Sequence, residues 1–184
     1  MLAFDPLDGA TGVAYHLVMA LTSAVPPAAA IVVFTCCVRA ALLPLAVRAI
    51  RGRGVGTQLA ASLATLPFIM ILYRLFTSST VDGTQNALLA RALWGVPLDG
   101  HFLAHPAAPV FWVVFAALAA VASWTSRRVP PEGPGRLLRF LPFGTVLVAG
   151  VLPLAAGVYL VTSTAWTAVE RAVLRPAKAP PDEE

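Results

Sequence analysis

The sequence predicts an all-α polytopic membrane protein with five transmembrane helices and an N-terminal interfacial amphipathic helix. Three observations predict this class. Hydrophobic residues make up 58% of the 184 residues, whereas soluble domains lie near roughly 45–50% even with glycine included. Charged residues make up only 12%, about half the usual share. The apolar residues also gather in long stretches that basic or turn-rich segments separate.

The N-terminal segment, residues 1–25, is expected to lie outside the membrane core. Val13, Leu17 and Leu21 recur at helical spacing, but a Pro-Pro pair ends the segment before it is long enough to span a bilayer. We therefore expect residues 11–24 to form an amphipathic helix in the membrane interface.

Two spans follow, at about residues 26–48 and 58–76. The first would be roughly 34 Å long as a helix, which is enough to cross the hydrocarbon. Pro44 should kink its C-terminal third. Residues 49–58 form a short, basic and glycine-rich connection between the two spans.

Residues 77–107 are polar and rich in turn-forming residues. They predict an exposed loop with one short amphipathic helix around residues 86–94. The third span, residues 108–126, is bracketed by Trp112 and Trp124, as expected for an aromatic belt at the two interfaces.

The last apolar tract, residues 137–169, would be roughly 50 Å long as one helix, too long for a simple span. Basic residues flank the tract at both ends, which favours an even number of crossings. We therefore expect two short helices, 138–151 and 154–170, that turn near Pro153 and thin the surrounding bilayer. The tail, residues 171–184, is expected to be disordered.

The basic residues orient the five-helix core, residues 26–170. Cytoplasmic loops collect Lys and Arg, and an outside N-terminus with a cytoplasmic C-terminus places most of the basic residues inside. The inside positions are Arg48, Arg51, Arg53, Arg127, Arg128, Arg136, Arg139, Arg171, Arg175 and Lys178. Arg74 and Arg91 fall outside, and Arg39 lies within the membrane.

The composition gives no support for nucleic-acid binding, metal binding or catalysis. The net charge of +4 follows from the loop bias, and the adjacent Cys36 and Cys37 suit apolar packing better than a disulfide. His101 and His105 have the spacing of metal ligands, but they stand in a loop beside Pro106 without a third ligand. No nucleophile–base or phosphate-binding motif is present. We therefore expect no cofactor, no metal and no enzyme activity.

The functional prediction depends on Arg39. Its guanidinium stands near the middle of the first span, where insertion costs roughly 2.5–3.5 kcal/mol, and no predicted hydrocarbon core contains Asp or Glu. Two interpretations remain open. Backbone carbonyls and Ser or Thr hydroxyls could satisfy the arginine inside the bundle, or the arginine could line a water-filled functional cavity. In the second case the cation would attract an acidic or polar passenger.

Other polar side chains could line the same cavity. Thr35 lies one turn from Arg39 on the same face of the helix. Taken singly, Ser and Thr in spans more often join helices by hydrogen bonds. The remaining candidates in the later spans are Gln58, Ser62, Thr65, Thr145, Thr162, Ser163, Thr164 and Trp166.

The order of these features resembles the YidC family of membrane protein insertases. The first span has Thr, then Arg one turn on, then Leu-Pro-Leu, and the second has Pro-Phe followed by Tyr-Arg-Leu. Residues 92–100, ALWGVPLDG, are similar to a Leu-Trp loop motif of that family, and the last segment resembles its closing helix. The matching residues are Thr35, Arg39, Pro44, Pro67, Tyr73, Arg74, Pro153, Gly157, Tyr159 and Ser163. Leu160, Thr164 and Glu170 stand where an aromatic residue, Asn and Gln are common.

The resemblance covers roughly residues 12–175 and implies a bundle around a hydrophilic groove, open to the cytoplasm and to lipid but closed outside. The groove arginine would hold the polar or acidic flank of a nascent membrane protein, and Tyr159 joins the candidate groove residues. The apolar span of the substrate would slide into lipid, where its burial supplies the driving force. One departure concerns residues 49–58, which replace a long charged cytoplasmic hairpin of the family.

We therefore expect a membrane protein insertase or chaperone of the bacterial plasma membrane. Its expected partners are nascent membrane proteins and the lipid bilayer, with the Sec translocon and the ribosome as further candidates. Two alternatives remain. A degenerate paralogue could bind or assemble membrane proteins without inserting them alone. A small channel or transporter could use Arg39 as an anion site, although the internal repeats common in transporters are absent.

Overall fold

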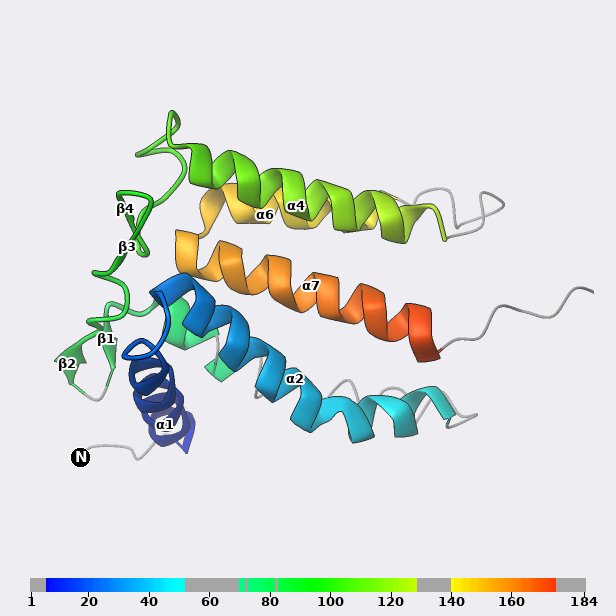
Figure 1. Ribbon diagram of the computed structural model, residues 1–184, viewed down its shortest axis with the longest axis horizontal. Coiled ribbons are helices and arrows are strands. Elements are labelled where there is room, and N and C mark those ends of the chain that lie inside the picture. The colour runs from blue at the N-terminus through cyan, green and yellow to red at the C-terminus, as the bar shows by residue number, and fades with distance from the viewer. Residues whose placement is uncertain (1–5, 52–69, 72, 82, 129–139, 175–184) are drawn as a thin grey trace, which may run out of the picture.

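The computed structural model describes residues 6–51, 70–71, 73–81, 83–128 and 140–174. This part of the chain is mostly helical, with a few short strands. Its long helices lie side by side, and α7 packs against both α2 and α4 (Figure 1). They are α2 (Pro27–Arg51), α4 (Pro109–Ser126) and α7 (Leu154–Leu174), and the short α6 (Gly144–Val151) lies along α4.

Two helices in the described part of the chain are long and apolar enough to cross a membrane. They are α2, over Pro27–Pro44, and α4, over Pro109–Ser126. Each begins with a proline in its first turn, where the missing backbone N–H has no intrahelical partner to lose. The predicted all-α class is confirmed at this level: a helical chain with two candidate membrane spans.

The break between α6 and α7 falls at Leu152 and Pro153. Leu152 is extended, with φ −77° and ψ 155°, because a residue before proline avoids the helical region. The turn expected near Pro153 therefore lies where α6 ends and α7 begins. The start of α6 differs from the expected residues 138–151. A 3-10 turn at Leu141–Phe143 comes first, and the α-helix itself begins only at Gly144.

The first residues of α7 are held by the loop that precedes α4. The backbone N–H of Leu154 donates to the carbonyl of Gly100 at 2.9 Å, and that of Ala155 donates to the carbonyl of Leu98 at 2.9 Å. The first N–H groups of a helix have no partner within it, so these loop carbonyls satisfy them. We call this end of the bundle, where α2, α4 and α7 begin, the loop end (Figure 1).

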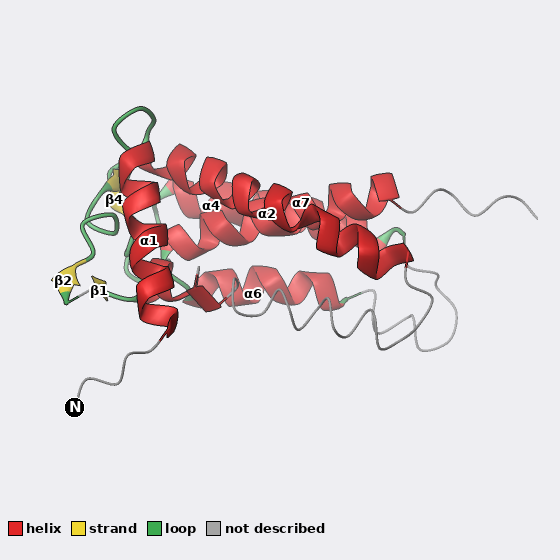
Figure 2. Ribbon diagram, turned by 90° about the horizontal axis from the view of Figure 1, so that it is seen from below, coloured by secondary structure: helices red, strands yellow, loops and turns green. Residues whose placement is uncertain are grey.

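Helix α1 (Pro6–Leu21) runs crosswise to the long helices at the loop end (Figure 2). Ala14 and Val18 are buried, while Val13 and Leu17 are 62% and 53% exposed. The apolar residues of α1 therefore lie on two sides of the helix: Ala14 and Val18 pack on the protein, and Val13 and Leu17 are exposed. The helix begins earlier than the expected residues 11–24, and its crosswise direction suits a helix lying in a membrane interface.

The prediction of a short helix around residues 86–94 is wrong. Asn86 instead forms a turn, because its Oδ1 accepts a hydrogen bond from the N–H of Leu88 at 3.2 Å. Trp94 and Gly95 then both have positive φ, 51° and 81°, as a two-residue hairpin turn requires. Short antiparallel hairpins occupy this region: β1 (Thr80–Val81) with β2 (Thr84–Gln85), and β3 (Ala92–Leu93) with β4 (Val96–Pro97).

An aromatic cluster fastens the loop to α4. The ring of Phe102 lies 5.1 Å from that of Phe115 and 5.8 Å from that of Phe111, measured between centroids. The indole Nε1 of Trp112 donates to the carbonyl of Pro106 at 3.0 Å. Such aromatic pairs contribute about 0.5–1.5 kcal/mol each beyond their buried area. The loop end is therefore a packed part of the fold.

Several expectations concern residues outside those that the structure describes. The second span, 58–76, lies there except for residues 70–71 and 73–76, which are helical. The cytoplasmic connection and the tail also lie there, apart from the residues that extend α2 to Arg51 and α7 to Leu174.

Candidate functional site

A hydrogen bond between α2 and α7 marks the candidate site. The guanidinium Nη2 of Arg39 donates to the hydroxyl oxygen of Ser163. Ser163 is buried at 6% exposure, and Arg39 itself is half-buried. A hydrogen bond to a charged donor is stronger than one between neutral groups. The hydroxyl of α7 therefore fixes the guanidinium inside the helix bundle.

The same two residues line a cavity of about 370 Å³. Helices α2, α4, α6 and α7 all contribute to its wall. The polar lining residues are Arg39, Thr125, Thr145, Ser163, Thr164, Thr167 and Arg171. Thr125 and Arg171 belong to the last turns of α4 and α7, so the cavity extends toward the end of the bundle opposite the loop end. Arg39 therefore has a hydroxyl partner inside the bundle, as in the first interpretation, and its side chain also borders a cavity.

The charge of this cavity is positive. Arg39 and Arg171 are the charged residues among the described residues that line it, and neither Asp nor Glu is among them. A guanidinium presents several N–H donors and no acceptor. In a partly buried cavity the pair of cations favours a carboxylate or another anionic group over a cation.

The threonines of the cavity wall contribute acceptor oxygens. Their hydroxyl protons are directed to backbone carbonyls of their own helices: Thr145 to Pro142 at 2.7 Å, Thr164 to Leu160 at 2.7 Å, and Thr167 to Ser163 at 3.0 Å. Each oxygen retains capacity to accept. The cavity therefore combines donors on its arginines with acceptors on its threonines. A polar polypeptide segment, which carries both backbone N–H and C=O groups, matches that combination.

The structure brings together four of the residues selected from the sequence: Arg39, Thr145, Ser163 and Thr164. Two others lie elsewhere. Thr35 is completely buried, and its hydroxyl donates to the carbonyl of Ile31 at 2.7 Å. Tyr159 packs toward the loop end, with its ring 5.8 Å from that of Phe76. Gln58, Ser62 and Thr65 lie outside the described residues.

Sequence reasoning missed Thr125, Thr167 and Arg171 as groove residues. A signal for two of them was present, because Thr167 and Arg171 follow Ser163 at successive spacings of one helical turn and so share its face. Thr125 has no such signal, because its position depends on how α4 packs against α7. Trp166, also suggested by its polarity, does not line the cavity. Its indole N–H is buried and finds no hydrogen-bond partner among the described residues.

His101 and His105 are exposed in the loop, and Cys36 and Cys37 are free thiols. Within the described ranges, no group of three or more His, Cys, Asp or Glu side chains could hold a metal ion. The candidate site is therefore the positive cavity around Arg39. Comparisons with protein-family models, with curated proteins and with solved structures found no match.

Proposed function

We propose that this chain is a membrane protein insertase that helps nascent membrane proteins enter the bilayer through the positively charged cavity around Arg39. The observation that carries the proposal is the Arg39–Ser163 hydrogen bond at the wall of a cavity whose described lining includes arginines and no carboxylate. The order of motifs that resembles the YidC family supports the same function.

The proposal includes a five-helix bundle in the bacterial plasma membrane, with the N-terminus outside and the C-terminus in the cytoplasm. Support comes from the apolar lengths of α2 and α4 and from the basic residues Arg127, Arg128 and Arg171 at the ends of α4 and α7. Because cytoplasmic ends collect Lys and Arg, that end of the cavity faces the cytoplasm in this arrangement.

In this mechanism the substrate enters from the cytoplasm. The guanidinium of Arg39 binds the polar or acidic flank that must cross the membrane, and the threonine oxygens accept hydrogen bonds from its backbone. This exchange replaces water contacts that the flank loses, and it thereby lowers the cost of moving polar groups into the membrane. The apolar span of the substrate then leaves for lipid, and its burial drives insertion.

The short α6 contributes to the same mechanism. The α-helix runs from Gly144 to Val151 after a single 3-10 turn, and together these are shorter than the roughly 30 Å hydrocarbon of a typical bilayer. A short apolar helix draws the two lipid surfaces toward each other. The polar flank then has a shorter path to cross.

The partners of this function are nascent membrane proteins and lipid, and the ribosome and the Sec translocon are the sources from which a substrate would arrive. The short connection at residues 49–58 favours a second function, in which the chain assembles membrane proteins that another insertase delivers.

A depletion experiment tests the proposal. The insertase of a bacterial host is depleted, this chain is expressed, and insertion of a single-span substrate with a short acidic outer tail is measured. We expect the wild type to restore insertion and Arg39→Ala to reduce it about tenfold, which corresponds to ~1.4 kcal/mol and to the loss of one charge-assisted hydrogen bond.

Arg91→Ala is the matched control, because Arg91 is exposed in the loop and lies outside the cavity. It should insert like the wild type. A substrate with an uncharged tail should depend less on Arg39 than the acidic one. Equal insertion by the wild type and Arg39→Ala rejects the cavity mechanism. A stable wild type that restores nothing rejects autonomous insertion, and co-purification with membrane proteins then supports the assembly function.

A further inference from the structure

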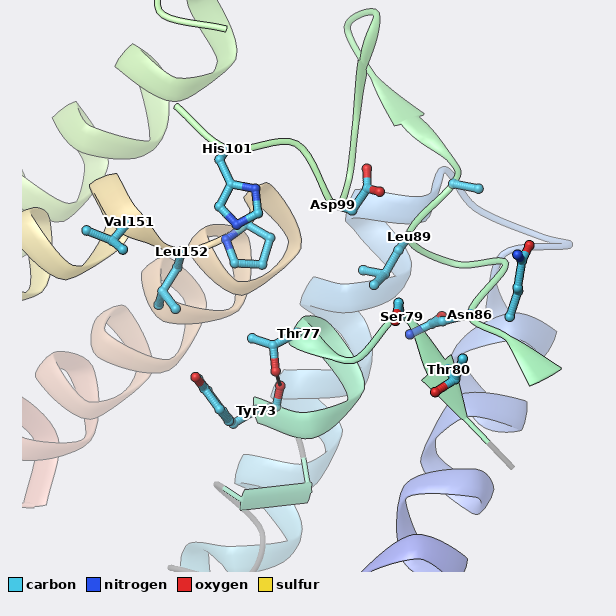
Figure 3. A pocket seen from close by; sticks show the side chains of 13 residues that line it. Tyr73, Thr77, Ser79, Thr80, Asn86, Leu89, Asp99, His101, Val151 and Leu152 are labelled. Atoms are coloured by element: carbon cyan, nitrogen blue, oxygen red, sulfur yellow. Dashed lines mark hydrogen bonds between the residues drawn. The ribbon is translucent and has the colours of Figure 1, made fainter. Parts of the chain in front are cut away.

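A second cavity, of about 820 Å³, lies at the loop end of the bundle (Figure 3). Asp99 and His101 border it on one side, and Tyr73 and Thr77 border it on the opposite side. Val151, at the end of α6, is part of its wall as well. Its lining shares no residue with the cavity around Arg39. It is therefore a separate site.

The walls of this loop-end cavity are fixed by hydrogen bonds. The side-chain Nδ2 of Asn86 donates to the carbonyls of Leu75 at 2.8 Å and Ser78 at 3.1 Å, which ties the loop to the helix at residues 73–77. On the other side, His101 pairs with Pro153 in an isolated β-bridge. A cavity whose walls are already held in place loses little conformational entropy when it binds a ligand.

The charge of the lining selects the ligand. Asp99 brings a carboxylate, and neither Lys nor Arg is among the described residues that line the cavity. The hydroxyl of Thr77 donates to the carbonyl of Tyr73 at 2.7 Å, so its oxygen is left as an acceptor. A primary ammonium group, which carries a positive charge and three N–H donors, complements a carboxylate and hydroxyl oxygens. A ligand that carries only a phosphate or carboxylate, with no ammonium group, meets neither Lys nor Arg among the described lining residues.

An apolar surface adjoins the polar cavity. Val151 lines the cavity and is 71% exposed, and Leu147 and Val148, one turn earlier in α6, are 78% and 52% exposed. Residues three and four positions apart lie on one face of a helix, so this exposed face of α6 continues from the cavity wall. A polar cavity that continues into an apolar face fits an amphiphile better than a water-soluble peptide, because the apolar face would bury a hydrocarbon chain.

We infer that the loop-end cavity binds a phospholipid with a primary ammonium headgroup. The ammonium group pairs with Asp99, and an acyl chain lies along Leu147, Val148 and Val151 of α6. Such a lipid would occupy the bilayer surface beside the short helix α6, at the end of the bundle away from Arg39. This site is additional to the proposed insertase function and does not require it.

The test measures lipids retained by the full chain. The chain is purified in detergent, incubated with phosphatidylethanolamine, phosphatidylcholine or phosphatidylglycerol of identical acyl chains, and analysed by native mass spectrometry. We expect phosphatidylethanolamine to be retained roughly two- to fivefold more than the other two, the preference that one partly exposed ion pair supplies. Phosphatidylcholine is the sharper comparison, because its quaternary ammonium has the charge but no N–H donor.

Asp99→Asn should abolish this preference while leaving the shape of the cavity unchanged. Glu170→Gln is the matched control, because it also removes one carboxylate but lies outside the cavity, and it should retain the preference. Val151→Gln tests the acyl chain independently and should lower retention of all three lipids. Equal retention of the three lipids by the wild type, or an unchanged preference in Asp99→Asn, overturns the inference. Displacement of the lipid by an equal concentration of a soluble lysine peptide overturns it in favour of a peptide site.

Discussion

The guanidinium of Arg39 in α2 donates a hydrogen bond to the hydroxyl of Ser163 in α7, and this bond joins the first long helix to the last. The free-energy cost of placing an arginine in a membrane falls when the arginine forms hydrogen bonds inside a helix bundle. Here one partner is a hydroxyl that is itself buried. This bond uses one of the several N–H donors of Arg39, and the residue also lines the cavity.

Ser163→Ala should destabilise the protein by about 1.5 kcal/mol. This value is the lower end for hydrogen bonds to charged groups, because Arg39 is only half-buried. Thermal unfolding in detergent micelles measures the change. Thr162→Val is the control, because the Thr162 hydroxyl donates to the carbonyl of Val158 within its own helix at 2.9 Å and should matter little. Equal stability of Ser163→Ala and the wild type would contradict the assigned role of the bond.

Thr35→Val should leave both insertion and stability nearly unchanged, within about 0.5 kcal/mol. Among the described residues, the Thr35 hydroxyl bonds only the carbonyl of Ile31 in its own helix, and the side chain is absent from the cavity lining. Valine has the same shape and removes no contact with a neighbouring helix. The depletion assay and thermal unfolding measure the two effects. If Thr35→Val lost as much insertion as Arg39→Ala, Thr35 would have to be counted among the residues that act in insertion.

Asn86→Ala should destabilise the loop end by about 2–3 kcal/mol. The side chain of Asn86 is buried and serves two carbonyls and one N–H, of Leu75, Ser78 and Leu88, and buried groups left without partners lose their full hydration energy. Amide hydrogen exchange of residues 73–100 measures the effect. Gln85→Ala, at an exposed neighbour, serves as the control, and similar exchange in both variants would refute the prediction.

Gly100→Ala should destabilise the fold by more than 1 kcal/mol, in the range of strained substitutions at tight backbone contacts. A Cβ at this position would stand 2.9 Å from the carbonyl oxygen of Pro97, and the carbonyl of Gly100 also holds the start of α7. Gly150→Ala in α6 is the control, because no atom lies within 4 Å of a Cβ there and alanine favours helix. The melting temperature should fall for the first variant and stay level or rise for the second.

Helix positions could be predicted from the sequence where proline and apolar length decide them. The third span was expected at residues 108–126 and α4 covers Pro109–Ser126, and Pro153 separates α6 from α7 as expected. The hairpin at Trp94 and Gly95 could not be recognised from hydrophobic spacing, because a helical stripe and a short turn-rich loop share the same apolar residues over so few positions. The glycine after the tryptophan was the signal that helical spacing concealed.

The candidate site residues could be selected from the sequence as polar positions in apolar helices, but the hydrogen-bond partner of each side chain could not be predicted. Arg39 and Ser163 were both selected as polar residues in apolar helices, yet nothing in the sequence states that they bond each other. Thr35 was selected for its closeness to Arg39 along one helix face, but a threonine inside a helix can direct its hydroxyl to its own backbone. Such choices depend on packing between helices, which sequence spacing alone does not specify.

The hydrogen bonds from Leu154 and Ala155 to the carbonyls of Gly100 and Leu98 have a consequence for the order of folding. These contacts join residues far apart in the sequence, and contacts of that kind form late because a long segment must close first. During synthesis the carbonyls of Gly100 and Leu98 would be hydrated until α7 was synthesised and could donate to them. The arrival of α7 would then complete the loop end and bring Ser163 to Arg39 in the same step.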